Sequence, residues 1–403
     1  MTNFQMEEAQ LSHKHRNLSI VALNAVSTLS QIGQYGLGTT LLPIALVAEG
    51  ATPEQIGITS SAFWLGMLLG LLVTGQLTRT FGYRITVIIG LVVSALSFAV
   101  IPLIAWQWWS LPAAAIGFGL GLRWIANETW LYRLAPAHAR GKFIGIHETL
   151  ISVAAIIAPL IIVGVGEIKP SAFWIAGAII MVAILPLFIA TTLPAVENSK
   201  ESDSIKALPS FNLCKNLKHS VAFLMGFGAL IAGLGGWMEG SILAFLPVYS
   251  ADISLVSSDV AWLFTILGVG AMTCQFAIGW LADYKGVLWT AKLCTLAAFV
   301  AVTIAVVFGK SFISLAITMF ILGGVGGGLL TLGIFWATLN DKGDNLSNRV
   351  RQVSIIYTIL SASGPFVAGF IVSHTSSASL FWQQLVVILV IFAVLFIQPH
   401  ADK

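Results

Sequence analysis

Apolar residues gather into twelve long runs, and short polar segments separate one run from the next. A helix needs about 20 mostly apolar residues to cross a bilayer, and each run reaches roughly that length. The runs are continuous rather than alternating, so they predict helices and exclude a closed β-barrel. The sequence therefore predicts an all-α integral membrane protein with twelve transmembrane helices. The runs cover approximately residues 18–47, 56–77, 84–104, 111–132, 143–166, 171–193, 219–249, 258–282, 290–308, 313–338, 351–373 and 379–397.

The composition points to the same surroundings. Hydrophobic residues make up 57% of the chain and charged residues 9%, and the mean hydropathy is +0.92. A soluble domain carries about 25% charged residues, so a water-soluble fold of this length could not cover its surface with so few charges. The lipid bilayer is the predicted solvent.

Lysine and arginine are concentrated in the even-numbered connections, whereas the odd-numbered ones hold only Lys169 and Lys310. Positive charge favours the cytoplasmic side, so both termini are predicted in the cytoplasm and the protein in the cell inner (cytoplasmic) membrane. The net charge of +3 follows from this topology and requires no nucleic-acid partner. The first 17 residues contain no apolar core or cleavage site, so no removable signal peptide is expected.

The longest polar stretch, residues 194–218, predicts a cytoplasmic linker between two six-helix bundles. These bundles are residues 18–193 and 219–397, with cytoplasmic tails at 1–17 and 398–403. The segment GQLTRTFGYR at 75–84 and the segment GWLADYKGVL at 279–288 each follow the second helix of their bundle. Their matching residues are separated by a constant 204 positions, and such weak internal symmetry is typical of a duplicated transporter fold. The matching residues are Gly75, Leu77 and Gly82 in the first copy and Gly279, Leu281 and Gly286 in the second.

This repeated segment resembles a signature of the major facilitator superfamily, G-x-L-a-D-x-x-G. The second copy fits it through Asp283, whereas Arg79 stands where the first copy would have an acid. Arg140-Gly141 resembles the family's usual pair in the fourth connection, and the stretch RWIANETW…APAHARGKFIGIHETL resembles one bacterial subgroup of transporters. The resemblance implies two halves that rock about a central cavity, with cytoplasmic connections acting as gates. The gate residues it implies are Gly75, Leu77, Arg79, Gly82, Arg84, Gly279, Asp283, Gly286 and Arg140.

Two contacts are predicted between these gate segments. Asp283 is expected to meet Arg140 near the start of the fifth helix. Arg79 is expected to meet Asp341 or Asp344 before the eleventh helix, in a charge-swapped contact. The alternative is that Arg79 is only a solvated positive charge, and an exposed pair contributes about 0–1 kcal/mol.

Polar residues inside the runs mark the predicted solute cavity, because charge inside a membrane is costly and usually functional. Arg123 and Asn127 share one face of the fourth helix and are expected to face the cavity, with Glu128 turned toward a neighbouring helix. A polar stripe of helical period on the first helix is expected to line the cavity as well. Its residues are Asn24, Ser27, Gln31, Gln34, Tyr35 and Gly38. The alternative in both cases is hydrogen bonding between helices. The predicted cavity residues are Arg123, Asn127, Gln31, Gln34, Tyr35 and Trp237.

Four titratable residues are candidates for proton coupling: Glu128, His147, Glu148 and Glu239. The first three are expected at one depth, where neighbouring carboxylates could share a proton. The alternative is that Glu148 pairs with Arg140 or Lys142. Glu239 follows a glycine-rich, bendable stretch of the seventh helix, as expected of a gating helix, and the alternative is an ordinary hydrogen-bonding acid.

The function predicted from these features is secondary active transport of a small solute, coupled to protons, with export favoured. The solute is expected to be amphipathic, zwitterionic or anionic. The chain lacks the Gly-Lys-Ser/Thr loop of ATP-driven pumps, and its cysteines, Cys214, Cys274 and Cys294, have no metal-ligand spacing. No enzymatic activity, metal or cofactor is expected, and the protein is expected to be a monomer. The alternatives are nutrient import and a non-transporting sensor or assembly protein that keeps the fold.

Overall fold

The computed structural model describes residues 3–134, 140–165, 169–190, 226–338 and 344–397. Within these ranges the chain is helical and contains no β-strand. The longer helices of the first part are α1 (Asn3–Ser30), α2 (Gly38–Ala48), α3 (Pro53–Val100), α4 (Ser110–Leu134), α5 (Arg140–Val165) and α6 (Pro170–Val182). Those of the second part are α9 (Phe227–Asp252), α10 (Ser257–Lys285), α11 (Val287–Phe308), α12 (Phe312–Thr338), α13 (Asp344–His374) and α14 (Ser379–Ile397). Short helical turns are η2 (Ile101–Leu103), η3 (Trp106–Trp108) and η5 (Leu185–Phe188).

Nine helical segments among the described residues are long and apolar enough to cross a membrane. One of them, Pro53–Leu103, is 51 residues long and contains two of the predicted runs. The α4 segment is absent from the nine because Arg123, Asn127 and Glu128 lower its hydropathy. The prediction of an all-α membrane protein is confirmed, whereas the count of twelve spans stays a prediction.

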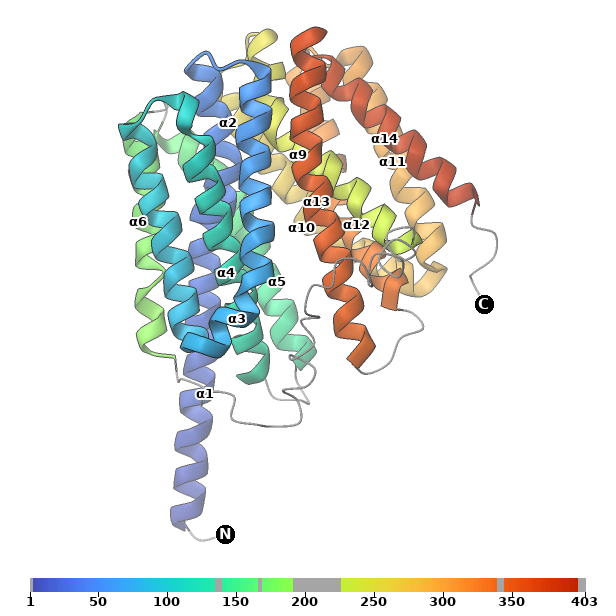
Figure 1. Ribbon diagram of the computed structural model, residues 1–403. Coiled ribbons are helices and arrows are strands. Elements are labelled where there is room, and N and C mark those ends of the chain that lie inside the picture. Colours follow the sequence, from blue (N-terminus) through green and yellow to red (C-terminus); the bar gives the residue numbers. More distant parts are fainter. Residues whose placement is uncertain (1–2, 135–139, 166–168, 191–225, 339–343, 398–403) are drawn as a thin grey trace, which may run out of the picture.

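The first span is one continuous stack of three segments. The helix α1 is followed by η1 (Gln31–Leu37), a wider π-helical segment, and then by α2. The residues 3–17, expected as a tail, are helical and continue directly into the span; Figure 1 shows α1 projecting beyond the bundle. Short π-helical segments inside α-helices occur frequently at functional sites, and η1 contains Gln31, Gln34 and Tyr35.

The matching glycines of the two repeats have the same backbone conformation. Gly82 has φ 78° and ψ 169° where the two segments of α3 meet. Gly286 has φ 88° and ψ 154° between α10 and α11. Side chains disfavour this region of backbone space strongly. The repeated glycine of the motif is therefore explained by the turn that each copy must make.

Replacing Gly82 with alanine is expected to lower the free energy of unfolding by about 1–3 kcal/mol, because the backbone conformation is almost restricted to glycine. Nothing lies within 4 Å of an added Cβ there, so the loss would come from the backbone alone. Gly279→Ala is the matched control, since Gly279 also has open space around it but lies inside α10. Thermal unfolding of the purified variants would measure the difference, and equal stabilities would contradict this explanation.

The internal symmetry extends to helix crossings that the motif does not include. An added Cβ at Gly117 on α4 would lie 1.9 Å from the carbonyl oxygen of Phe63 on α3. At Gly323 on α12 it would lie 1.9 Å from the carbonyl oxygen of Leu267 on α10. Glycine at both crossings therefore allows the backbones to touch, as membrane helix packing often requires.

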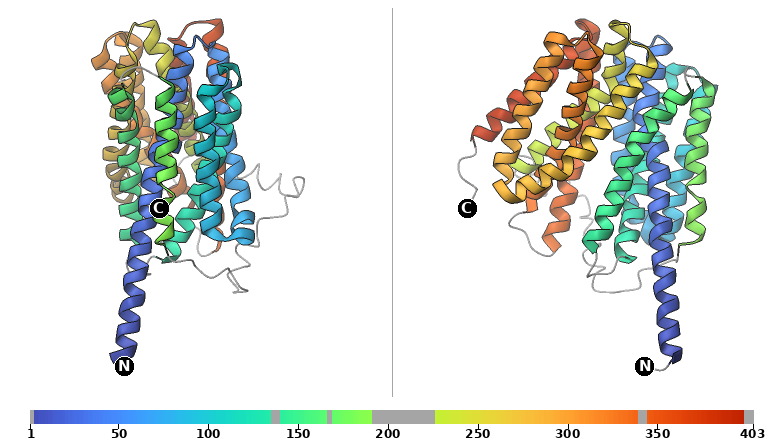
Figure 2. Two further views of the ribbon diagram at one scale, coloured as in Figure 1. Left: turned by 90° about the vertical axis from the view of Figure 1, so that its left-hand side faces the viewer. Right: turned by 180° about the vertical axis from the view of Figure 1, so that it is seen from behind.

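The helices form two groups, α1–α6 and α9–α14, which approach each other at the upper end of Figures 1 and 2 and diverge toward the lower end. The helix pairs α3 and α13, α5 and α10, and α2 and α9 make most of the contacts between the groups, and α9 also contacts α3. At one of these contacts the Ser61 hydroxyl donates a hydrogen bond of 2.7 Å to the carbonyl oxygen of Ala362. Gly57 and Gly369 pack closely beside it, since their Cβ positions would meet backbone atoms of the opposite helix.

Candidate functional site

A cavity of about 300 Å³ lies between the two groups of helices. Its walls come from η1, α3, α4 and α5 on one side and from α9, α10, α12 and α13 on the other. The charged residues among the described residues that line it are all acids, and no lysine or arginine is among them. Its polar and aromatic lining residues are Gln31, Tyr35, Trp64, Trp124, Glu128, Glu148, Ser152, Glu239, Gln275 and Tyr357.

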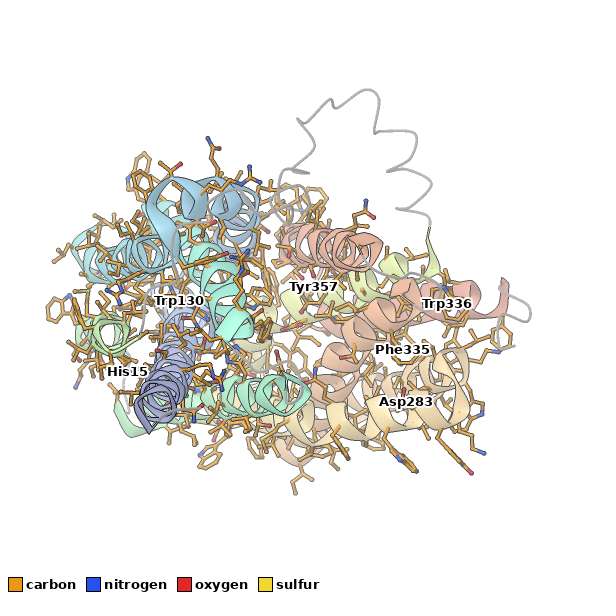
Figure 3. The ribbon with its side chains drawn as sticks, turned by 90° about the horizontal axis from the view of Figure 1, so that it is seen from below. His15, Trp130, Asp283, Phe335, Trp336 and Tyr357 are labelled. Atoms are coloured by element: carbon orange, nitrogen blue, oxygen red, sulfur yellow. The ribbon has the colours of Figure 1, made fainter. Side chains whose placement is uncertain are left out.

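The carboxylate of Glu239 joins the two groups at this cavity. It accepts a hydrogen bond from the hydroxyl of Tyr35 on η1 and another from the hydroxyl of Tyr357 on α13. Figure 3 shows Tyr357 near the boundary between the groups. Tyr35 and Glu239 are separated by 204 residues, the same separation as the repeated motif, so they occupy corresponding positions of the two repeats.

Trp64 fills the space beside these two tyrosines. Its ring packs edge-on against Tyr35, with ring centroids 6.2 Å apart, and against Tyr357 at 6.3 Å. Trp64 is 3% exposed. It also lines a second, smaller cavity of about 20 Å³ together with Thr39 and Thr59. Trp64 is therefore a wall shared by the central cavity and a smaller cavity next to it.

A second titratable cluster surrounds Glu128 on α4. The indole of Trp124 donates a hydrogen bond to the Glu128 carboxylate, and Nε2 of His147 on α5 lies 3.7 Å from the same carboxylate oxygen. The His147 side chain is fully buried. The helices α4 and α5 thus bring together two of the residues predicted for proton coupling.

The proton position on His147 follows from its other partner. The Asn24 amide nitrogen donates to the carbonyl oxygen of Ile20 at 2.9 Å, so the amide oxygen of Asn24 faces His147 Nδ1 at 2.9 Å. That oxygen can only accept, and Nδ1 must therefore carry a hydrogen. In neutral His147 the Nε2 lone pair would face the Glu128 carboxylate. Nε2 is thus the ring atom directed at Glu128, at 3.7 Å from its carboxylate oxygen.

Glu148 lies one residue after His147 and lines the same cavity. Its backbone carbonyl accepts a hydrogen bond of 2.9 Å from the hydroxyl of Ser152, which lines the cavity as well. The alternative partners, Arg140 and Lys142, have side chains outside the described residues. Three carboxylates, from α4, α5 and α9, therefore face one cavity.

Arg123 is placed behind the lining rather than in it. Its side chain is 0% exposed. Its Nε donates to Gln34 Oε1 at 3.1 Å and its Nη2 donates to Gln31 Oε1 at 2.9 Å. Arg123 was expected to face the cavity, but it binds two glutamines of η1. Glu128 approaches His147 of the neighbouring helix α5, as expected, and also lines the cavity.

Asn127 also makes hydrogen bonds between helices. Its amide donates to the carbonyl oxygen of Leu23 at 3.0 Å and to the Ser27 hydroxyl at 2.7 Å. Of the predicted cavity residues, Gln31 and Tyr35 line the cavity, whereas Arg123, Asn127, Gln34 and Trp237 are not among the described residues that line it. A direct role for those four residues in solute binding stays a prediction.

The predicted gate segments lie away from this cavity. Arg84 donates a hydrogen bond to the carbonyl oxygen of Ala190, and Asp283 is exposed near the end of α10, in the second group of Figure 3. Asp341 lies outside the described residues, as do the side chains of Arg140 and Asp344. The Asp283–Arg140 and Arg79–Asp341 or Asp344 contacts therefore stay predictions.

Three aromatic residues of the site were not predicted from the sequence: Trp64, Trp124 and Tyr357. The first two tryptophans had a detectable signal, because they lie inside predicted runs and not at the ends where interfacial tryptophans gather. Tyr357 had no comparable signal, since only its hydrogen bond to Glu239 distinguishes it from other aromatic residues of an apolar run.

A family model described as the Major Facilitator Superfamily matches residues 23–341, and the chain belongs to this family. It is 26% identical over 345 residues to the uncharacterized MFS-type transporter YcaD of Escherichia fergusonii, covering 85% of this chain and 86% of that protein. The corresponding protein of Salmonella arizonae is 25% identical over the same length, with the same shares covered. The protein is thus a multi-pass membrane transporter and not an enzyme.

Solved structures show the same fold. The nucleoside transporter NupG superposes with a TM-score of 0.75 at 14% identity, covering 94% of this chain and 98% of that one. A D-xylose-proton symporter superposes with a TM-score of 0.68 at 14% identity, covering 95% and 97%. At this level of identity, the similarities show the fold alone.

Proposed function

We propose that this protein exports a small solute across the cytoplasmic membrane in exchange for protons. The observation that supports it most directly is the central cavity, whose charged lining residues are Glu128, Glu148 and Glu239. A carboxylate can hold a proton or attract a cationic group, and each weakens the binding of the other. Competition for one group is a coupling free energy between two ligands, and it favours exchange over co-transport.

The proposed transport cycle uses the two groups of helices as its moving halves, with residues 18–193 and 219–397 as their bounds. With both termini in the cytoplasm, the end of the molecule near Trp64 faces the outside. The ring of Trp64, held by Tyr35 and Tyr357, then closes the cavity on that side. Separation of the halves there would require Tyr35 to leave Glu239, so the hydrogen bond reports which state the protein is in.

The solute class suggested by this lining differs from the one expected from sequence. The expectation of a zwitterionic or anionic solute relied on Arg123 as a cavity residue. Arg123 lies behind Gln31, and the acids line the cavity instead. A solute with positive charge is therefore better matched, and aromatic faces such as those of Trp64 and Trp124 also attract cations.

Import of a neutral polar solute is the second candidate. It is favoured by the amide groups of Gln31 and Gln275, which line the cavity beside aromatic rings. In that reading the carboxylates would carry the proton that accompanies the solute.

Proteoliposomes with an internal pH indicator would separate these candidates. For a panel of cationic and neutral solutes, we expect that a cationic solute entering the vesicles drives protons out. Protons entering with the solute would favour import by co-transport. The absence of any solute-dependent proton movement, with correctly folded protein, would contradict coupling to protons.

A further inference from the structure

Arg123 fixes the direction in which a cavity residue presents its hydrogen-bonding groups. The guanidinium has five N–H donors and no acceptor. Any amide that binds the guanidinium must therefore direct its oxygen toward it, because only the oxygen can accept. The Gln31 oxygen accepts from Arg123 Nη2 at 2.9 Å, which leaves the Gln31 NH2 group to face the remaining space.

The side-chain oxygens of Gln31 and Gln34 both accept hydrogen bonds from Arg123. The two glutamines differ in the hydrogen-bond partners of their NH2 groups. The Gln34 NH2 group donates to the carbonyl oxygen of Gly90 at 3.2 Å and to the Ser94 hydroxyl at 2.7 Å. Gln34 is 0% exposed and is satisfied inside the first group of helices. Gln31 is half-buried and lines the cavity, and its NH2 group has no hydrogen-bond partner among the described residues.

We infer that Arg123 is a positioning residue that makes Gln31 a hydrogen-bond donor to the solute, and that the cavity takes an organic cation that also carries an acceptor oxygen. The donor from Gln31 on η1 meets the acceptor oxygen. The carboxylates of Glu239 and Glu128 face the same space and attract the cationic nitrogen. This inference rests on the proposed function, because it names the solute of that same cavity.

The acceptor requirement follows from the cost of an unmet donor. A buried donor that loses its partner is destabilised by its desolvation, whereas a matched acceptor restores the bond. A cation without an acceptor would leave the Gln31 NH2 group unpaired when it displaces water. An anion would meet three carboxylates. The anion and the cation without an acceptor should both bind more weakly than a cation that carries an ether or carbonyl oxygen.

Binding can be measured on the purified full-length protein without any transport, through the shift of its thermal unfolding midpoint. Three panels of aryl compounds matched in size serve as probes: amines with an ether or carbonyl oxygen, amines without one, and carboxylates. We expect the first panel to bind about three- to tenfold more tightly than the second, which corresponds to one hydrogen bond. Carboxylates that bind best, or amines that do not bind at all, would overturn the inference.

Three variants test the role of the amide. Gln31→Glu keeps an oxygen on Arg123 but has no NH2 group, so the preference for the first panel should disappear. Gln34→Glu changes the equivalent bond outside the lining and should keep that preference. Arg123→Met releases the Gln31 amide and should reduce it. A preference that survives Gln31→Glu overturns the positioning role, and Gln31→Met decides the question if Gln31→Glu does not fold.

The outcome is independent of the transport test. Amines could bind with the expected preference while no proton moves, and then the proposed exchange would fail and the solute class would stand. Protons could move with a solute of another class, and then only the solute class would fail.

Discussion

Glu239→Gln is expected to abolish solute accumulation driven by a pH gradient while leaving exchange of solute for solute intact. Glutamine keeps the shape of the side chain but cannot release a proton. One pH unit is worth 1.36 kcal/mol, so a gradient of about two units can support up to about 100-fold accumulation for each proton exchanged. Without a titrating group at Glu239, the accumulation ratio should fall to about one.

The measurement is uptake into proteoliposomes with and without the pH gradient, followed by exchange with no gradient. Asp252→Asn is the matched control, because this acid lies on the same helix, is exposed and is not among the described residues lining the cavity. Full accumulation in Glu239→Gln, combined with its loss in Glu128→Gln, would assign the proton to the His147–Glu128 pair instead.

Trp64→Ala is expected to open the central cavity to the outside. The ring is shared by the two cavities and is held by both tyrosines. Losing about 1.4 kcal/mol of contact in the closed state would raise the population of the open state about tenfold. A cysteine at Ser152, in the lining, should then react correspondingly faster with a membrane-impermeant thiol reagent added to intact cells.

The labelling would use a background in which Cys214, Cys274 and Cys294 are replaced. Trp124→Ala is the control, since Trp124 lines the central cavity but not the smaller one. Truncating a buried tryptophan can cost about 3–5 kcal/mol of stability, so Tyr357→Phe provides a milder variant that removes only the hydrogen bond to Glu239. Equal labelling in Trp64→Ala and Trp124→Ala would show that Trp64 is no barrier.

Apolar periodicity and the repeated motif predicted the membrane fold because lipid imposes a single strong requirement on every span. The repeated glycines at 82 and 286 were found from spacing alone, and their shared positive φ gives the physical reason for that spacing. The extension of α1 across the predicted tail was not foreseen, since a polar helix outside the membrane leaves no apolar signal.

The directions of individual polar side chains were much harder to predict. The stripe on the first helix was treated as one face of an ideal helix, but the π-helical η1 changes the rotation between Ser27 and Tyr35. Asn24 binds His147, Ser27 binds Asn127, and Gln34 binds Arg123. These residues of the stripe therefore make hydrogen bonds between helices, which was the alternative to lining the cavity. Sequence spacing could not distinguish the two uses, because both require polar atoms at helical period.

The pairing of Tyr35 with Glu239 has a consequence for how this cavity could have arisen. In a symmetric dimer of identical halves, each residue on the axis faces its own copy. Two glutamates would repel each other there, and two tyrosines would provide no titrating group. A donor opposite an acceptor at corresponding positions requires halves that are free to differ. Because the two halves belong to one chain, their sequences can differ, and a carboxylate can face a neutral partner at this position.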